Sequence, residues 1–274
     1  MIPAACDYLA VDSAEAAIAA LTEHGDDAKL LAGGHSLIPL MKMRLASPAM
    51  LIDIGRVTDL SGIEERDDHI AVGALCRHAD IERSDVLLQH APMLAHVASQ
   101  VGDPSVRHCG TLGGSLAHGD PASDLPAAAL ALGATIVVRG AGGERRIDAA
   151  DFFTGIFETA LAADEMLTEV LVPKTHGAGW SYQKFNRRAQ DWAIVAAAVQ
   201  LGATPRVALV NMGPTPLRAT AVEQALAAGS SAADAAAIAA QAGDPSSDLN
   251  ADADYRRHLA IVLTRRAIAA ASKP

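Results

Sequence analysis

The stretch RHCGTLGGSLAHGDPASDLP, residues 107–126, concentrates glycines, hydroxyl side chains and two aspartates. Because glycine lacks a β-carbon, Gly113 and Gly114 would let the backbone approach a phosphate closely, with their N–H groups pointing at its oxygens. Thr111 and Ser115 would add hydroxyl donors. We therefore expect this stretch to form a loop around an anionic ligand and to organise the rest of the chain.

A similar segment, KLLAGGHS, occupies residues 29–36. Its short apolar run ends in Gly33 and Gly34, and the hydroxyl of Ser36 follows. Paired glycines also form ordinary turns between strands and helices, so each segment alone leaves both interpretations open. Together they suggest two walls of one site. Neither segment has the spacing of a dinucleotide fingerprint or of a nucleotide triphosphate loop, so a different phosphate-binding arrangement is indicated.

Four segments carry a resemblance to a known family. AGGHS at 32–36, TLGGS at 111–115, YQKFNRRAQDWA at 182–193 and YRRHLAIVLTRRA at 255–267 occur in the family's order. The chain resembles the FAD-binding medium subunits of molybdenum hydroxylases, a group that includes the flavoprotein subunit of carbon monoxide dehydrogenase and the flavin domain of xanthine dehydrogenase. The resemblance covers nearly the whole chain.

The resemblance implies an α+β fold in two domains. A two-lobed FAD-binding domain would span residues 1–175, with lobes at about 1–55 and 56–175, and a C-terminal flavoprotein domain would span 176–274. The sequence pattern itself indicates a helix over 13–24 and a hairpin around 140–143. It also indicates a three-stranded antiparallel meander over 180–185, 193–200 and 206–211, followed by helices.

By resemblance, both glycine segments and several single positions would bind FAD. One wall, for the diphosphate and adenine ribose, would be Lys29, Leu30, Leu31, Ala32, Gly33, Gly34, His35 and Ser36. The other would be Thr111, Leu112, Gly113, Gly114 and Ser115, with Asp124 at the hydroxyl-bearing or flavin-proximal part of FAD. Val101, Leu167 and Lys184 would line the flavin or its adenine end.

Single side chains in this set keep alternative roles. Lys184 would place a cation near the flavin ring and favour its anionic reduced form, or would be an exposed strand lysine. Asp124 would serve FAD or only cap a helix. Whether His35 and His118 touch the flavin or only brace the segments is open. We assign no catalytic side chain and no metal ligand, since the ten histidines show no ligand spacing.

The resemblance further implies the role of an oxidoreductase subunit. The chain would accept electrons on FAD from a small subunit with 2Fe–2S clusters, beside a large subunit with the molybdenum cofactor, in a dimer of heterotrimers, and pass them to an external acceptor. The alternatives are a stand-alone FAD oxidoreductase of the same fold and a flavin-binding module without turnover. The sequence names neither the substrate nor the acceptor.

Composition bounds these interpretations. The 274 residues, half of them hydrophobic, allow a sizeable core, and the net charge of −10 argues against a nucleic-acid partner. The three cysteines are too few for the four thiolates of an iron–sulfur cluster. No apolar run approaches the length of a membrane span and no signal peptide is visible, so we expect a cytoplasmic protein.

Overall fold

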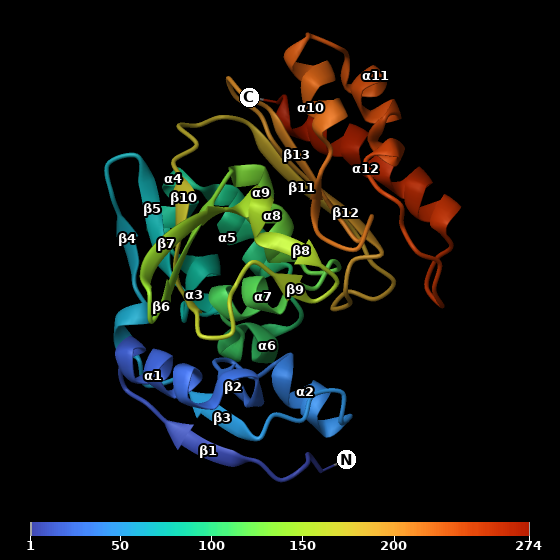
Figure 1. Cartoon of the computed structure of the whole chain (residues 1–274). Helices are drawn as coiled ribbons and strands as arrows, with labels where there is room; N and C mark the ends of the chain where they lie inside the picture. The colour runs from blue at the N-terminus through green and yellow to red at the C-terminus, as the bar shows by residue number, and fades with distance from the viewer. Residues whose placement is uncertain (1, 274) are drawn as a thin grey trace.

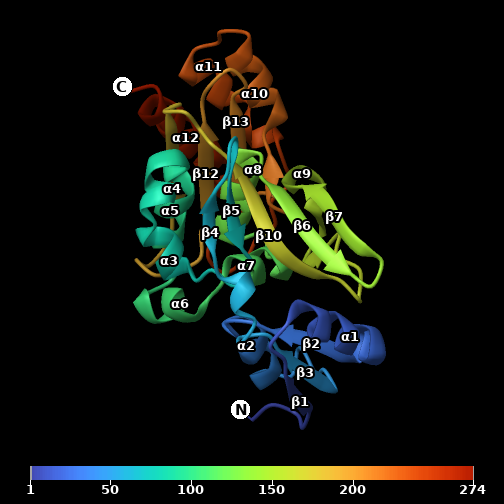
Figure 2. The ribbon, with the colours of Figure 1, turned by 90° about the vertical axis from the view of Figure 1, so that its left-hand side faces the viewer.

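The computed structural model describes residues 2–273, which form three bodies in a row. Figures 1 and 2 show the N-terminal lobe at one end, a central lobe in the middle and the C-terminal helices at the opposite end, so the two termini lie far apart. The central lobe therefore contacts both of the others, and the stretch 107–126 lies within it.

The N-terminal lobe is a small unit built on a parallel sheet of three strands. The strand order is β1-β3-β2, with β1 at Asp7–Ala10, β2 at Ala28–Leu31 and β3 at Met50–Asp53. Helix α1 (Ala14–His24) begins at Ser13, whose hydroxyl accepts from the amide of Ala16. Helix α2 (Leu37–Lys42) follows the first glycine segment directly. Strand, glycine turn and helix are thus consecutive in the chain.

The central lobe is built on an antiparallel sheet of order β4-β5-β10-β6-β7. These strands are Ile63–Glu65, His69–Gly73, Met166–Pro173, Thr135–Gly140 and Gly143–Asp148. The sheet carries the helices α3 (His78–Arg83), α4 (Asp85–His90), α5 (Pro92–Ser99), α6 (Pro104–Cys109), α7 (Leu112–His118), α8 (Asp124–Leu132) and α9 (Ala149–Phe152). A small hairpin, β8 (Phe153–Gly155) with β9 (Glu158–Thr159), extends from it.

The C-terminal domain is an antiparallel sheet of order β11-β12-β13-β14 covered by helices. Its strands are Trp180–Phe185, Val195–Gln200, Arg206–Val210 and Leu217–Arg218. Helices α10 (Thr220–Ala227), α11 (Ala232–Ala237) and α12 (Ala253–Ala271) follow, and Figure 1 shows them on the outer side of this sheet. The predicted meander is confirmed, but the sheet has four strands and not three, because the short strand β14 pairs with β13.

Helix α8 joins the central and C-terminal cores. All of its residues are buried, and it packs against α5 on one side and against β12 and β13 on the other. Alternate residues of β12 belong to two cores: Ala196 and Ala198 face the central lobe, whereas Val195 and Val199 face the C-terminal helices. The central lobe and the C-terminal sheet are therefore packed against each other across the predicted domain boundary.

The stretch 107–126 is not the open loop that its glycines suggested. Gly113 and Gly114 lie in the first turn of α7, and Gly119 ends that helix in the left-handed conformation with φ of 65°. The stretch therefore supplies a helix N-terminus in place of a flexible loop. Over residues 2–273, no helix is long and apolar enough to cross a membrane.

Candidate functional site

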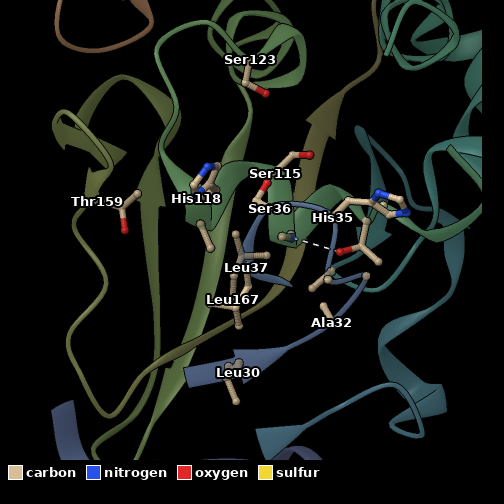
Figure 3. Close-up of a pocket in the computed structure, with 18 of the residues that line it drawn as sticks. Leu30, Ala32, His35, Ser36, Leu37, Ser115, His118, Ser123, Thr159 and Leu167 are labelled. Carbon is tan, nitrogen blue, oxygen red and sulfur yellow. Dashed lines mark hydrogen bonds between the residues drawn. The ribbon is translucent and has the colours of Figure 1, made fainter. Parts of the chain in front are cut away.

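A cavity of about 840 Å³ lies where the N-terminal and central lobes meet, and its edge reaches the C-terminal domain. This volume is within the range of small-molecule and cofactor sites. Residues 28–37 form one wall and parts of 110–118 another, while Lys184 and Trp192 come from the C-terminal domain. Figure 3 shows Ser36 and Ser115 in its centre, with Leu30, Leu37 and Leu167 below them. One cavity thus contacts all three bodies.

The first glycine segment presents free backbone donors to this cavity. It connects β2 to α2, and Gly34 has φ of 72°, which favours glycine. Within the part of the chain that the structure describes, the amides of Gly33, Gly34, His35 and Ser36 donate to no protein acceptor. Consecutive unpaired amides at a helix N-terminus suit an anion. This segment is therefore the main candidate for holding phosphate oxygens.

The second glycine segment has its amides already occupied. The amide of Leu112 donates to Cys76 O at 3.0 Å and that of Gly113 to Ala74 O at 2.8 Å. The amide of Gly114 donates to the hydroxyl of Thr111, the N-cap residue of α7, at 3.2 Å. The expectation that the Gly113 and Gly114 amides point at a ligand is therefore wrong. What this segment offers the cavity is side-chain hydroxyls, from Thr111 and Ser115.

The glycines instead allow three backbone segments to pack closely. A β-carbon on Gly33 would overlap the carbonyl oxygen of Cys109 and lie 2.9 Å from the Cα of Gly110. A β-carbon on Gly113 would lie 2.8 Å from the carbonyl oxygen of Ala74. Both distances are shorter than van der Waals contact allows. The two cavity walls thus touch through positions where only glycine fits.

Lys184 is buried, and its charge is balanced by a carboxylate. Its side chain is 6% exposed, and its Nζ lies 2.8 Å from Asp124 Oδ2 and 3.1 Å from the carbonyl oxygen of Gln100. The hydroxyl of Tyr182 donates to the other oxygen of Asp124. The exposed-lysine alternative is therefore wrong. The structure also places no isolated cation here, since Asp124 neutralises Lys184.

Burial controls the titration of this group. Desolvation raises the pKa of Asp124, while the charge and hydrogen bond of Lys184 and the hydroxyl of Tyr182 oppose that shift. Burial and the neighbouring Asp124 raise the pKa of Tyr182 well above its ordinary range. Asp124 lies on α8 and its two partners on β11, so this ion pair also connects the central lobe to the C-terminal domain.

The two histidines left open by the sequence both line the cavity. The ring of His118 packs against that of Phe157, with centroids 5.0 Å apart, and burial lowers its pKa. His35 is exposed and lies at the turn before α2. Figure 3 shows the two histidines on either side of Ser36 and Ser115. His118 therefore packs against an aromatic ring of the β8–β9 hairpin, and this contact braces the cavity wall.

The cavity brings together nearly all of the residues expected from the sequence. These are Lys29, Leu30, Leu31, Ala32, Gly33, Gly34, His35, Ser36, Val101, Thr111, Gly113, Gly114, Ser115, Asp124, Leu167 and Lys184. Leu112 is the exception, because it is 1% exposed and packs in the central core.

The sequence interpretation missed part of the lining. His78, Thr159, Leu161 and Trp192 also face the cavity. Trp192 lies in a segment that carried the family resemblance, and this was an available signal. The sequence carried no comparable signal for His78, Thr159 and Leu161, because these residues reach the cavity only through tertiary packing. Between residues 2 and 273, no group of three or more His, Cys, Asp or Glu side chains is arranged to hold a metal ion.

Comparison with known proteins gives matches over the whole chain. The family described as the FAD binding domain in molybdopterin dehydrogenase matches residues 4–175, and the CO dehydrogenase flavoprotein C-terminal domain matches residues 180–271. The carbon monoxide dehydrogenase medium chain of Hydrogenophaga pseudoflava is 40% identical, covering 99% of this chain and 98% of that protein.

Two further matches extend this comparison. Subunit alpha of the 6-hydroxypseudooxynicotine dehydrogenase complex of Paenarthrobacter nicotinovorans is 37% identical, with coverage of 99% and 96%. A solved structure of the Hydrogenophaga pseudoflava carbon monoxide dehydrogenase, which lacks the Mo-pyranopterin moiety of its cofactor, superposes with a TM-score of 0.94 at 40% identity, with coverage of 99% and 98%. Sequence and structure comparisons thus agree along the full length.

Proposed function

The chain belongs to the family of FAD-binding medium subunits of molybdenum hydroxylases, and from this we propose that it transfers electrons within such a complex. It is an oxidoreductase subunit with a binding domain for FAD. In our proposal, it receives electrons from a partner subunit with 2Fe–2S clusters and passes them to an external acceptor. The observation that carries the proposal is the cavity lined by both glycine segments.

The residues present fit FAD. The unpaired amides of residues 33–36 suit the diphosphate, and the hydroxyls of Thr111 and Ser115 face it from the opposite wall. Leu30, Leu167 and Val101 supply apolar surface for the ring systems. When bound, FAD supplies the redox chemistry, and the protein's task is to bind, orient and electrostatically tune it. We assign Asp124 and Lys184 to the flavin-proximal part as a neutral pair.

The same geometry suggests which part of the cavity each domain forms. We propose an FAD-binding domain over 1–175 and a C-terminal domain over 176–274, which closes the cavity edge with Lys184 and Trp192. Trp192 is 55% exposed although it lines the cavity. We propose that this edge, where Trp192 borders both the cavity and solvent, is the side from which a redox partner approaches.

The partner subunits are inferred from family and composition. Carbon monoxide and 6-hydroxypseudooxynicotine are unlike substrates, yet the subunits of both dehydrogenases resemble this chain to a similar degree. Substrate choice therefore fits a different subunit, one with the molybdenum cofactor. The three cysteines of this chain are fewer than one cluster needs, so the iron–sulfur donor also fits a partner. We propose a dimer of these heterotrimers.

Anaerobic reduction of the purified chain and of the complex tests this function. The isolated chain should contain FAD released by denaturation, without stoichiometric iron or molybdenum, and should not oxidise a hydroxylase substrate. Co-expression with neighbouring genes should yield a complex in which substrate reduces the FAD. Turnover by the isolated, metal-free chain would favour a stand-alone oxidoreductase. FAD that no partner subunit reduces would favour a binding module.

A further inference from the structure

His78 lies directly beneath the second glycine segment. It is the first residue of α3 and is 3% exposed, and its amide donates to Gly110 O at 3.0 Å. Its ring fills the space beside Gly110, where a β-carbon would lie 2.7 Å from the Nε2 of His78. The ring therefore lies tightly against the backbone of the second glycine segment at Gly110.

Among the residues that the structure describes, the ring makes one polar contact, and that contact is with a cavity residue. Nε2 lies 3.3 Å from the hydroxyl oxygen of Ser115. The other nitrogen, Nδ1, is buried and has no hydrogen-bond partner among residues 2–273. Burial lowers the pKa of His78 to about 4, and the nearby His35 and Arg107 act in the same direction. The imidazole is therefore neutral at pH 7, with a proton on one nitrogen only.

The orphaned Nδ1 indicates which nitrogen holds the proton. If Nδ1 were protonated, a buried N–H would lack an acceptor, which costs about 1–3 kcal/mol. With the proton on Nε2, the ring donates to Ser115 Oγ, and Nδ1 keeps only an unused lone pair. In this arrangement the Ser115 hydroxyl accepts from His78, and its own hydrogen is free to point into the cavity.

We propose that His78 is a positioning residue that turns the Ser115 hydroxyl into a donor to an anionic oxygen of the bound ligand. The inference rests on the proposed function, in which that ligand is the FAD diphosphate. It matters because the amides of Leu112, Gly113 and Gly114 already bond within the protein, which leaves hydroxyls as the donors of this wall. A neutral histidine achieves this without adding charge to the site.

A double-mutant cycle on FAD affinity tests the proposal. His78→Leu and Ser115→Ala should each weaken FAD binding by about fivefold to tenfold, the range of one neutral hydrogen bond. The double variant should bind no more weakly than Ser115→Ala alone, because both changes remove the same interaction. His78→Gln should stay within about twofold of wild type, since its amide nitrogen can replace Nε2.

Phosphorus NMR of the bound FAD gives a readout that a packing defect would not reproduce. The diphosphate resonances should shift alike in His78→Leu and Ser115→Ala and stay in place in His78→Gln. If His78→Leu does not fold, His78→Asn replaces it, because the shorter amide cannot reach Ser115. His96→Leu removes a half-buried histidine outside the cavity lining and should leave FAD affinity unchanged.

Two failures are distinguishable. Wild-type protein that binds no FAD would overturn the proposed function itself. Wild-type binding with additive losses in the double variant, or equal losses for the Gln and Asn variants, would overturn only the positioning role of His78.

Discussion

Gly33 packs against the backbone of Cys109 so closely that no β-carbon fits between them. The carbonyl oxygen of Cys109 occupies the place of that atom, and the Cα of Gly110 would lie 2.9 Å from it. Gly33 belongs to the N-terminal lobe and Cys109 to the end of α6 in the central lobe. The contact therefore sets the separation of the two cavity walls, and with it the space for the ligand.

A methyl group at position 33 should push these walls apart. We expect Gly33→Ala to cost about 1–3 kcal/mol of stability through overpacking and to weaken FAD binding at least tenfold. Urea unfolding of the apoprotein and fluorescence titration with FAD measure the two effects. Gly142→Ala is the matched control, because a β-carbon there meets no atom of residues 2–273 within 4 Å apart from those of its chain neighbours. Equal FAD affinity for the two variants would contradict the wall-contact argument.

The cap of α7 should couple stability to binding. Thr111 accepts from the amide of Gly114, and the loss of such a cap costs about 0.5–2 kcal/mol. Thr111→Val should lose this amount and also FAD affinity, whereas Thr111→Ser should keep both. Ser231→Ala removes the equivalent cap of α11, outside the cavity lining. It should lower the thermal midpoint without changing the FAD dissociation constant.

The sequence predicts the site well at the level of segments, because short motifs carry local information. Residues 32–36 do meet residues 111 and 113–115 in one cavity. The role of each backbone group is not local, however. The amide of Gly113 is unavailable because Ala74, distant in the chain, supplies an acceptor. Long-range packing also explains why Leu112 does not line the cavity, since its apolar side chain packs in the central core.

Prediction of the fold from the sequence has a similar limit. Periodicity and turn residues identify the hairpin of β6 with β7 and the meander of β11 to β13, since both signals are contained in the segments themselves. Strand β14 has only two residues and becomes a strand by pairing with β13. The sequence also did not indicate that Asp124 pairs with Lys184, because the packing of α8 against the C-terminal sheet brings the two side chains together.

Breaking this buried pair should destabilise the protein strongly. Asp124→Asn leaves the ammonium of Lys184 buried without an anion, which costs about 3–5 kcal/mol. Chemical unfolding of the apoprotein measures it. Asp254→Asn breaks the exposed pair with Arg257, where Asp254 is 95% exposed, and should cost less than about 1 kcal/mol. Similar losses for both variants would mean that water reaches Asp124 and Lys184.

His78 should make the stability of the apoprotein depend on pH in a defined window. Burial lowers its pKa from the ordinary 6.5 to about 4, so between these values the unfolded chain binds a proton that the folded chain does not. Protonation therefore favours unfolding, and the stability contributed by neutral His78 is present above pH 6.5 and is lost as pH falls towards 4. A shift of this size corresponds to about 3 kcal/mol.

His78→Gln removes the titrating group while keeping a polar side chain of similar length. Between pH 7 and pH 4, the variant should lose about 3 kcal/mol less of its unfolding free energy than wild type. Above pH 7 the two curves should run parallel, because His78 is neutral in both the folded and the unfolded chain. Urea unfolding monitored by circular dichroism across this range measures both slopes. Parallel curves down to pH 4 would show that the ring of His78 takes up its proton in the folded protein as readily as in the unfolded chain.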